Sequence, residues 1–183
     1  LKILGSKRDV DSTDSPSVRP GDLLRMRHEA SALAELGHPA IVRLLHAGID
    51  SGSIYLALEH VPGQSLDRLV TDGARPVPSR VAAWGAELCD ALALVHDRGI
   101  LHRDIKPANI LVDGARVKLL DFGMARVRGI HSDLDQGVIL GTLPYLALEA
   151  WGLAGEEIDG RADLYALAAT LYEVVTGKRA FEG

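Results

Sequence analysis

The sequence contains a single cysteine, Cys89, among its 183 residues. An internal disulfide is therefore impossible, and a zinc site built from several thiolates is excluded. The seven histidines show neither an H-E-x-x-H pattern nor cysteine partners, which argues against a histidine metal site. Because nothing requires an oxidising compartment, we expect a cytoplasmic protein, although a parent protein could be anchored to a membrane.

Long hydrophobic runs are also lacking. The most apolar stretch, residues 164–175, is about half as long as a membrane-spanning helix and contains Glu173. This stretch fits a buried helix of a globular protein better, so we expect no membrane segment in this chain. Residues 1–4 do not resemble the charged start of a secretory signal.

The sequence has no excess of positive charge. Its formal net charge is -5 and its pI is about 5.8. Binding to nucleic acid or to an anionic membrane needs clustered Lys and Arg, so we expect no nucleic-acid partner. With 47% hydrophobic residues, the chain can bury one sizeable core and a small second lobe.

The first third of the chain has the pattern of a small sheet with one packed helix. Residues 1–4 are typical of the end of a strand. Asp22 is a candidate cap for a helix whose apolar positions recur every three to four residues. Two short apolar runs, residues 41–45 and 54–58, are joined by turn-forming residues, which predicts a hairpin.

The rest of the chain is mainly helical in pattern. Ser79 is a candidate cap for a long amphipathic helix. Residues 110–112 and 117–120 flank Asp113-Gly114, a dipeptide that favours a tight hairpin. A second, strongly hydrophobic helix is predicted over residues 161–175.

Two polar motifs lie just outside this hairpin. The first is His102-Arg103-Asp104-Ile105-Lys106-Pro107-Ala108-Asn109, and the second is Asp121-Phe122-Gly123. They resemble the catalytic loop and the metal-binding D-F-G segment of eukaryotic-type (Hanks-type) serine/threonine protein kinases, in the family's order and in a similar strand and loop context. The six specified residues of the first motif would occur by chance at roughly one position in 10^7 to 10^8.

This resemblance covers nearly the whole chain, and its general style is that of a bacterial member of the family. It implies an α+β, two-lobed protein kinase-like fold forming one partial kinase domain over residues 1–183. Residues 1–61 would form a partial small β lobe with the hinge. Residues 62–183 would form a partial helical large lobe with the catalytic loop and the activation segment.

The resemblance implies a role for each polar residue of the two motifs. Phosphoryl transfer needs a carboxylate that orients the attacking hydroxyl and cations that neutralise the phosphate oxygens. Asp104 resembles the residue that accepts or orients the hydroxyl proton. Lys106 resembles the lysine that contacts the transferring phosphate in serine/threonine kinases, which favours Ser or Thr acceptors in protein substrates. Asn109, also part of the catalytic loop, and Asp121 resemble the ligands of Mg2+.

Further segments resemble the parts of the family that bind ATP. Residues 1–4 are similar to the strand that carries the phosphate-contacting lysine, here Lys2, and Glu29 is similar to its partner on the helix. Pairing of Lys2 with Glu29 would mark an active state. A plainer interpretation is a solvated terminal lysine and a charged helix face.

Residues 58–61 resemble the gatekeeper and the hinge between the lobes. Backbone groups of Glu59 and Val61 are therefore expected to contact adenine, and Leu111 is a further expected cofactor-binding residue. ATP and Mg2+ are the cofactors that the resemblance implies.

Residues 141–149 are similar to the end of an activation segment, with Thr142 near the catalytic aspartate and the protein substrate. Asp163 resembles the buried acid that anchors the backbone of the catalytic loop. His102 is expected to pack under Phe122 rather than to act as a base or ligand.

Control by phosphorylation is a further expectation. Arg103, which precedes the catalytic aspartate, is of the type that grips an added phosphate. Residues 123–140 offer only Ser132 as a hydroxyl for such a modification.

Three other interpretations stay open. Asp104, Asn109 and Asp121 could be ordinary turn and capping residues. The chain could also be a nucleotide-binding pseudokinase or scaffold, which the intact set of motif residues argues against. A kinase for small molecules such as aminoglycosides or choline is the third, and Lys106-Pro107 and Gly141-Thr142 argue against it.

The sequence starts and stops inside the family pattern. No Gly-rich phosphate loop precedes Lys2, and the chain stops soon after the second predicted helix. We therefore expect the isolated 183-residue product to be destabilised and nearly inactive, because exposed strand edges and uncovered helix faces favour aggregation.

Overall fold

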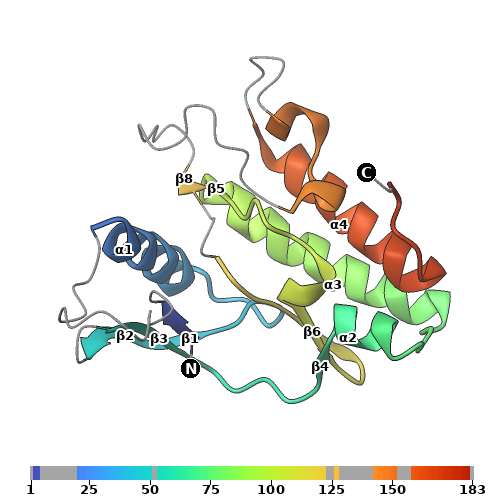
Figure 1. Cartoon of the computed structure of the whole chain (residues 1–183), viewed down its shortest axis with the longest axis horizontal. Coiled ribbons are helices and arrows are strands. Elements are labelled where there is room, and N and C mark those ends of the chain that lie inside the picture. Colours follow the sequence, from blue (N-terminus) through green and yellow to red (C-terminus); the bar gives the residue numbers. More distant parts are fainter. Residues whose placement is uncertain are drawn as a thin grey trace, which may run out of the picture.

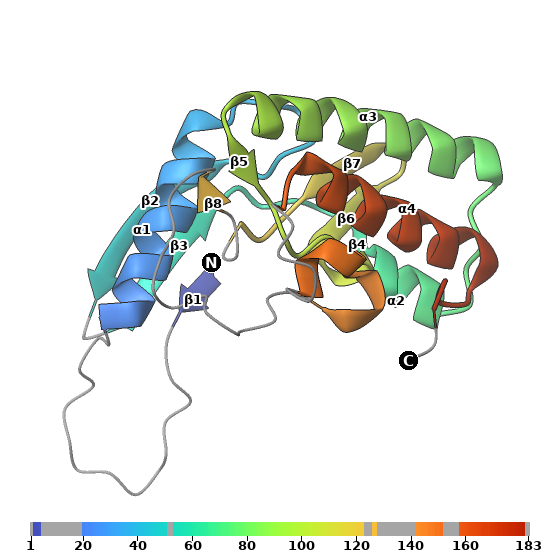
Figure 2. The same cartoon turned by 90° about the horizontal axis from the view of Figure 1, so that it is seen from above.

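The computed structural model describes residues 2–4, 20–50, 53–122, 126–127, 142–151 and 158–181. A small antiparallel sheet and one helix lie on one side of the molecule, and a helical part lies on the other (Figures 1 and 2). This arrangement confirms the α+β class expected of a partial two-lobed kinase fold. No helix in the described part of the chain is long and apolar enough to cross a bilayer.

The small sheet has three strands in the order β1-β3-β2, all antiparallel, and α1 packs against it. The elements are β1 (Lys2–Leu4), α1 (Pro20–Glu35), β2 (Leu44–Asp50) and β3 (Ser53–Leu58). Asp50 pairs with Ser53 across the end of β2 and β3, which confirms the predicted hairpin.

The strand predicted over residues 41–45 is wrong in extent, because β2 begins only at Leu44. Ile41 instead forms an isolated parallel bridge with Leu119 of the larger part. The Val42 N–H donates to the Leu119 carbonyl oxygen at 3.0 Å, and the Leu119 N–H donates to the Ala40 carbonyl oxygen at 2.7 Å. This segment is apolar because it packs between the two parts of the molecule.

In its described residues, the larger part has three α-helices around a central hairpin. The helices are α2 (Leu66–Thr71), α3 (Pro78–Asp97) and α4 (Gly160–Thr176). The strands are β4 (Gln64–Ser65), β5 (Ile100–Leu101), β6 (Ile110–Asp113), β7 (Arg116–Leu119) and β8 (Arg126–Val127). Among the described residues it also has three short 3-10 helices, namely η1 (Pro107–Asn109), η3 (Leu143–Tyr145) and η4 (Leu148–Trp151).

Both predicted helix caps were placed too late in the chain. α1 begins at Pro20, two residues before Asp22, and α3 begins at Pro78, one residue before Ser79. Proline is favoured at the first helical position because its φ is already helical and its missing N–H would have no partner there. Val77 is the cap residue of α3, and it makes no side-chain capping hydrogen bond.

The central hairpin also differs by one residue from its predicted turn. Asp113 pairs with Arg116, so the two turn residues are Gly114 and Ala115. Gly114 has a φ of 58°, in the left-handed region that glycine tolerates best. The turn therefore starts one residue after Asp113.

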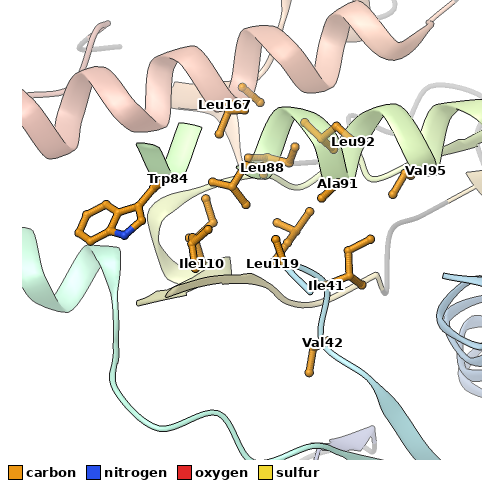
Figure 3. Close-up of a cluster of buried hydrophobic side chains, with 14 of the residues drawn as sticks. Ile41, Val42, Trp84, Leu88, Ala91, Leu92, Val95, Ile110, Leu119 and Leu167 are labelled. Atoms are coloured by element: carbon orange, nitrogen blue, oxygen red, sulfur yellow. The ribbon is translucent and has the colours of Figure 1, made fainter. Parts of the chain in front are cut away.

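The core of the larger part joins α3, α4 and the hairpin (Figure 3). One face of α3 contributes Leu88, Ala91 and Leu92, which lie against Leu119 and Leu167 among others and are almost fully buried. Because β5 and β6 are both fixed to this core, the polar segment between them has anchored ends. That segment is the first motif.

Candidate functional site

Asp163 holds the first motif by its backbone. This aspartate lies in the first turn of α4 and is 2% exposed. Its Oδ2 accepts from the His102 N–H at 2.9 Å, and its Oδ1 accepts from the Arg103 N–H at 2.9 Å. The expected anchor is therefore confirmed, and it fixes the loop that leads to Asp104.

His96 is a third partner of Asp163 that the sequence analysis missed. Its Nε2 lies 2.8 Å from Asp163 Oδ2. Burial raises the pKa of Asp163, but the hydrogen bonds from His96 and the two backbone amides, with the nearby His102, outweigh it and lower the pKa overall. In the sequence, the one feature that could have indicated this contact is the position of His96 in the last turn of the helix that precedes the motif.

His102 is a packing residue, as expected. Its ring makes an edge-to-face contact with Phe122, with 4.7 Å between centroids. Its Nε2 lies 2.9 Å from the Leu120 carbonyl oxygen, and its Nδ1 lies 3.3 Å from the Asp104 amide nitrogen. A tautomer with its proton on Nε2 satisfies both contacts, and it joins the two motifs through their backbones.

Asp104 is the centre of a compact polar cluster. Its Oδ2 accepts from Lys106 Nζ at 2.7 Å and from Asn109 Nδ2 at 3.0 Å. Its Oδ1 accepts from the Thr142 hydroxyl at 2.9 Å, and Lys106 Nζ also donates to that hydroxyl at 2.9 Å. The structure thus brings Asp104, Lys106, Asn109 and Thr142 together, although 38 residues separate Asp104 from Thr142.

The arrangement of the cluster has a chemical consequence. The Asp104 carboxylate has three donors and is half-buried, so its orientation is fixed. One of these donors is an alcohol, Thr142, beside the ammonium of Lys106. A carboxylate and a cation that share one hydroxyl can orient a second alcohol in the same way.

Asp121 directly follows a residue that is hydrogen-bonded to Asn109. The Leu120 N–H donates to the Asn109 carbonyl oxygen at 2.8 Å, which brings the two motifs side by side. Asp121 has a φ of 61° and Arg103 a φ of 66°, both uncommon for residues other than glycine. Such conformations cluster at functional sites. Gly123, the last residue of the second motif, lies outside the described residues.

Asn109 has a suitable oxygen for a hard cation. Its Nδ2 donates to the backbone oxygen and to Oδ2 of Asp104, which leaves its side-chain carbonyl oxygen as the atom for a further partner. In the described part of the chain, no group of three or more His, Cys, Asp or Glu side chains could hold a metal ion by itself. Mg2+ seldom needs such a group, because it binds one or two protein oxygens together with phosphates.

The predicted pairing of Lys2 with Glu29 lies partly outside the described residues. Lys2 lies on β1, where its backbone pairs with Leu56, but its side chain is outside the described part. Glu29 is fully buried on α1, an uncommon place for a carboxylate. The pairing therefore stays a prediction.

Glu59 and Val61 lie in the segment between β3 and β4, as the predicted hinge requires. The Glu59 N–H donates to the Arg43 carbonyl oxygen at 2.9 Å, so its backbone carbonyl is the group left for a ligand. The backbone of Val61 forms no backbone–backbone hydrogen bond with any residue that the structure describes. Leu111 lies on β6 and is half-buried between Ser65 and Lys118 of the neighbouring strands.

The Glu59 side chain has a partner that the sequence analysis missed. Its Oε1 accepts from Lys118 Nζ at 2.5 Å and from the Arg43 N–H at 3.0 Å. Burial raises the pKa of Glu59, but these hydrogen bonds and the charge of Lys118 outweigh it and lower the pKa overall. Lys118 Nζ also donates to the Ile41 carbonyl oxygen at 3.2 Å.

Other expectations fall on residues that the structure does not describe. Ser132, the candidate phosphorylation site, and Gly141 lie outside the described residues. The part of residues 141–149 that is described begins at Thr142, which has the position expected beside Asp104.

Comparisons with known proteins agree with this geometry. A family model described as the protein kinase domain matches residues 4–183. The chain is 39% identical over 171 residues to the serine/threonine-protein kinase PknB of Mycobacterium leprae and 38% identical over 166 residues to the serine/threonine-protein kinase Pkn2 of Myxococcus xanthus. It is also 38% identical over 171 residues to PknB of Mycolicibacterium smegmatis.

These matches include most of this chain but a small share of the relatives. They cover 90%, 87% and 90% of the chain, respectively. The chain spans 27%, 20% and 27% of the three relatives' own lengths.

Proposed function

Because this chain belongs to the protein kinase family, we propose that the protein transfers the γ-phosphoryl group of ATP to serine or threonine hydroxyls of protein substrates. The observation that supports this most strongly is the cluster of Asp104, Lys106 and Thr142, in which a fixed carboxylate and an ammonium share one alcohol. Since the reaction consumes ATP, the cytoplasm is the proposed compartment. Proteins are the proposed partners.

Asp104 orients the attacking hydroxyl in this proposal, and Lys106 neutralises charge on the phosphoryl group. The 2.7 Å contact between them keeps the hydroxyl and the phosphoryl group at neighbouring positions. Positioning and electrostatic stabilisation supply most of the rate enhancement in phosphoryl transfer, because the enzyme forms no covalent intermediate with the phosphoryl group.

Asn109 and Asp121 are the proposed Mg2+ ligands. Their oxygen donors suit this cation, and the hydrogen bond from the Leu120 N–H, one residue before Asp121, to the Asn109 carbonyl oxygen supports a shared site. When bound, Mg2+ would supply positive charge to the phosphate oxygens. Asn109 has a second task, because its amide nitrogen holds the Asp104 carboxylate.

The remaining proposed contacts are to the nucleotide. Lys2, with Glu29 as its partner, would bind the phosphates. The carbonyl of Glu59 and the N–H of Val61 would bind the adenine edge, and Leu111 would lie against the ring. The described backbone geometry of Glu59 and Val61 is compatible with these roles.

Replacing Asp104 by asparagine tests the assignment in the full-length protein. We expect Asp104→Asn to lower the rate of phosphoryl transfer by about 10^2- to 10^4-fold, because general-base contributions have that size. Radiolabelled transfer to a peptide measures the rate, and binding of a fluorescent ATP analogue should not change. Asp90→Asn, at an exposed position on α3, is the control and should keep full activity. An undiminished rate in Asp104→Asn would refute the assignment.

Two outcomes would favour the other interpretations instead. ATP binding without any transfer by the wild-type protein would indicate a pseudokinase or scaffold. Mass spectrometry that finds the phosphoryl group on a small molecule and not on protein would indicate a small-molecule kinase.

A further inference from the structure

The first residue of α4, Gly160, lies against the imidazole of His96. α3 and α4 lie side by side (Figures 1 and 2), and His96 in the last turn of α3 reaches the first turn of α4. A Cβ on Gly160 would lie 2.5 Å from Nδ1, 2.7 Å from Cε1 and 2.9 Å from Cγ of His96. Because non-bonded carbon atoms keep about 3.5–4.0 Å apart, the ring occupies the space that any other residue 160 would need.

The conformation of α4 gives no reason for a glycine at this position. Gly160 does not have a positive φ, in contrast to Gly114. Alanine favours a helix more than glycine does, and the exchange of glycine for alanine at a compatible position normally stabilises a protein. The helix also has its own cap, because the Asp159 carboxylate accepts from the Arg161 N–H at 2.9 Å. The close approach of His96 is therefore the feature that explains Gly160.

The His96 ring cannot turn away from Gly160 without losing its contact with Asp163. Its Nε2 lies 2.8 Å from Asp163 Oδ2, while Nδ1, Cε1 and Cγ lie on the side of Gly160. Gly160 and Asp163 are three residues apart on α4, so they lie on the same face of the helix. The ring is thus held between the backbone of one turn and the carboxylate of the next.

Asp163 extends this constraint to the loop that carries Asp104. The oxygen that contacts His96 also accepts from the His102 N–H, and the other oxygen accepts from the Arg103 N–H, both at 2.9 Å. Arg103 directly precedes Asp104 and has a φ of 66°. A conformation of this kind persists only where its surroundings hold it. A shift of the Asp163 carboxylate would therefore change the orientation of Asp104.

We propose that Gly160 is a positioning residue for phosphoryl transfer. It leaves room for the His96 imidazole, which holds the Asp163 carboxylate, which in turn fixes the loop that carries Asp104. A side chain at residue 160 displaces the ring from Asp163, so the rate of transfer falls while substrate binding does not. The proposal rests on the proposed function, because it concerns the orientation of the same catalytic carboxylate.

The structural step is tested first, without reference to catalysis. Hydrogen–deuterium exchange of the full-length protein, read by mass spectrometry, reports the His102 and Arg103 amides that Asp163 holds. We expect Gly160→Ala to accelerate this exchange at least about tenfold, the effect of losing one hydrogen bond to a charged group. Gly37→Ala is the matched control and should exchange as wild type, because a Cβ there would meet no atom within 4 Å.

A double variant separates the contact with His96 from a general effect on the helix. His96→Ala removes the ring, so Gly160→Ala should accelerate the exchange no further in that background. Independent, additive effects of the two substitutions would overturn the proposal. If Gly160→Ala alone did not fold, the double variant should recover folding, and its failure to do so would also overturn the proposal.

Catalysis is then measured with a short acceptor peptide. Gly160→Ala should lower kcat at least about tenfold and leave KM for ATP and for the peptide within about twofold of wild type. Gly85→Ala is the control for crowding inside a helix, because a Cβ there would lie 2.9 Å from Leu171 Cδ1, the end of a flexible side chain, and it should keep kcat.

Failure of this proposal can be told apart from failure of the proposed function. Exchange in Gly160→Ala at the wild-type rate would overturn the positioning role, even if both proteins phosphorylate the peptide. Faster exchange with an unchanged kcat would overturn it as well. Faster exchange in Gly160→Ala, together with no phosphorylation by the wild-type protein, would confirm the structural step and contradict the proposed function.

Discussion

At the scale of single residues, Asp163 shows how a buried charge can position a catalytic loop. It is almost fully buried, and two backbone amides and His96 surround its carboxylate. A buried charge is tolerated when hydrogen bonds replace its water. The loop cannot easily adopt another path, since its amides would then lose their acceptor.

Replacing Asp163 by asparagine should therefore destabilise the protein. We expect Asp163→Asn to lower the free energy of unfolding by about 3 kcal/mol at pH 7, because an amide nitrogen would face an N–H donor. Urea denaturation measures the loss. Asp90→Asn, exposed on the neighbouring helix α3, should change it by less than about 0.5 kcal/mol.

This loss should also depend on pH. The pKa of Asp163 is lowered in the folded protein, so its charge stabilises the fold fully above the unfolded pKa of about 3.9. That stabilisation is lost as the pH falls through the folded value. The difference between wild type and Asp163→Asn should therefore shrink below about pH 4, and a constant difference would contradict the lowered pKa.

The hydrogen-bonding role of the Thr142 hydroxyl can be tested separately from the packing of its methyl group. Its hydroxyl connects Lys106 to Asp104. We expect Thr142→Ala to lower kcat/KM about tenfold, since hydrogen bonds to charged groups contribute about 1.5–3 kcal/mol. Thr142→Ser keeps the hydroxyl and should stay close to wild type. Peptide phosphorylation assays measure both, and equal losses in the two variants would show that the methyl group matters instead.

The predictability of these residues differs for a physical reason. Asp104, Lys106 and Asn109 lie within one short motif, so their proximity could be expected from the sequence. The contacts of Glu59 with Lys118 and of Asp163 with His96 join residues 59 and 67 positions apart. No local pattern signals such pairs, because only the folded chain brings them together.

At the scale of elements, a substitution at Gly114 in the hairpin turn measures the effect of backbone strain alone on stability. Gly114 has a φ of 58°, and a Cβ there would meet no atom within 4 Å. We expect Gly114→Ala to destabilise the protein by about 1 kcal/mol, the cost of placing a side chain in the left-handed region. Gly37 is equally open and has no positive φ, so Gly37→Ala is the matched control. Thermal unfolding of both variants measures the difference, and similar values would contradict this explanation.

Elements were predicted well where periodicity determines them and less well at their ends. α4 covers the predicted residues 161–175, because a long apolar pattern permits little else. The starts of α1 and α3 were misplaced, since Pro20 and Pro78 outweigh the capping residues that follow them. Residues 41–45 were assigned to one strand because burial between two parts of a molecule produces the same apolar run as a strand.

At the scale of the whole molecule, the two parts are joined by a small set of polar contacts. Backbone hydrogen bonds join Ala40 and Val42 to Leu119. Beside them, Lys118 Nζ donates both to Glu59 Oε1 and to the Ile41 carbonyl oxygen. One lysine of the central hairpin thus holds the segment after β3 and the segment before β2 at the same time.

A double-mutant cycle on Glu59 and Lys118 should measure this connection. We expect Glu59→Gln and Lys118→Met to show a coupling free energy of about 1 kcal/mol at pH 7, at the upper end for ion pairs, because both side chains are about three-quarters buried. The pKa of Glu59 is lowered in the folded protein, so the coupling should disappear as the pH falls below the usual range of a glutamate.

The pair formed by Asp113 and Arg116 is the control for this cycle, because it lies at the turn of the same hairpin and does not join the two parts. Its arginine is 78% exposed, so Asp113→Asn and Arg116→Met should couple by less than about 0.5 kcal/mol. Urea denaturation gives both cycles on the same scale. Equal coupling free energies for the two pairs would show that the ion pair of Lys118 stabilises the protein no more than an exposed ion pair does, and would contradict its role in connecting the two parts of the molecule.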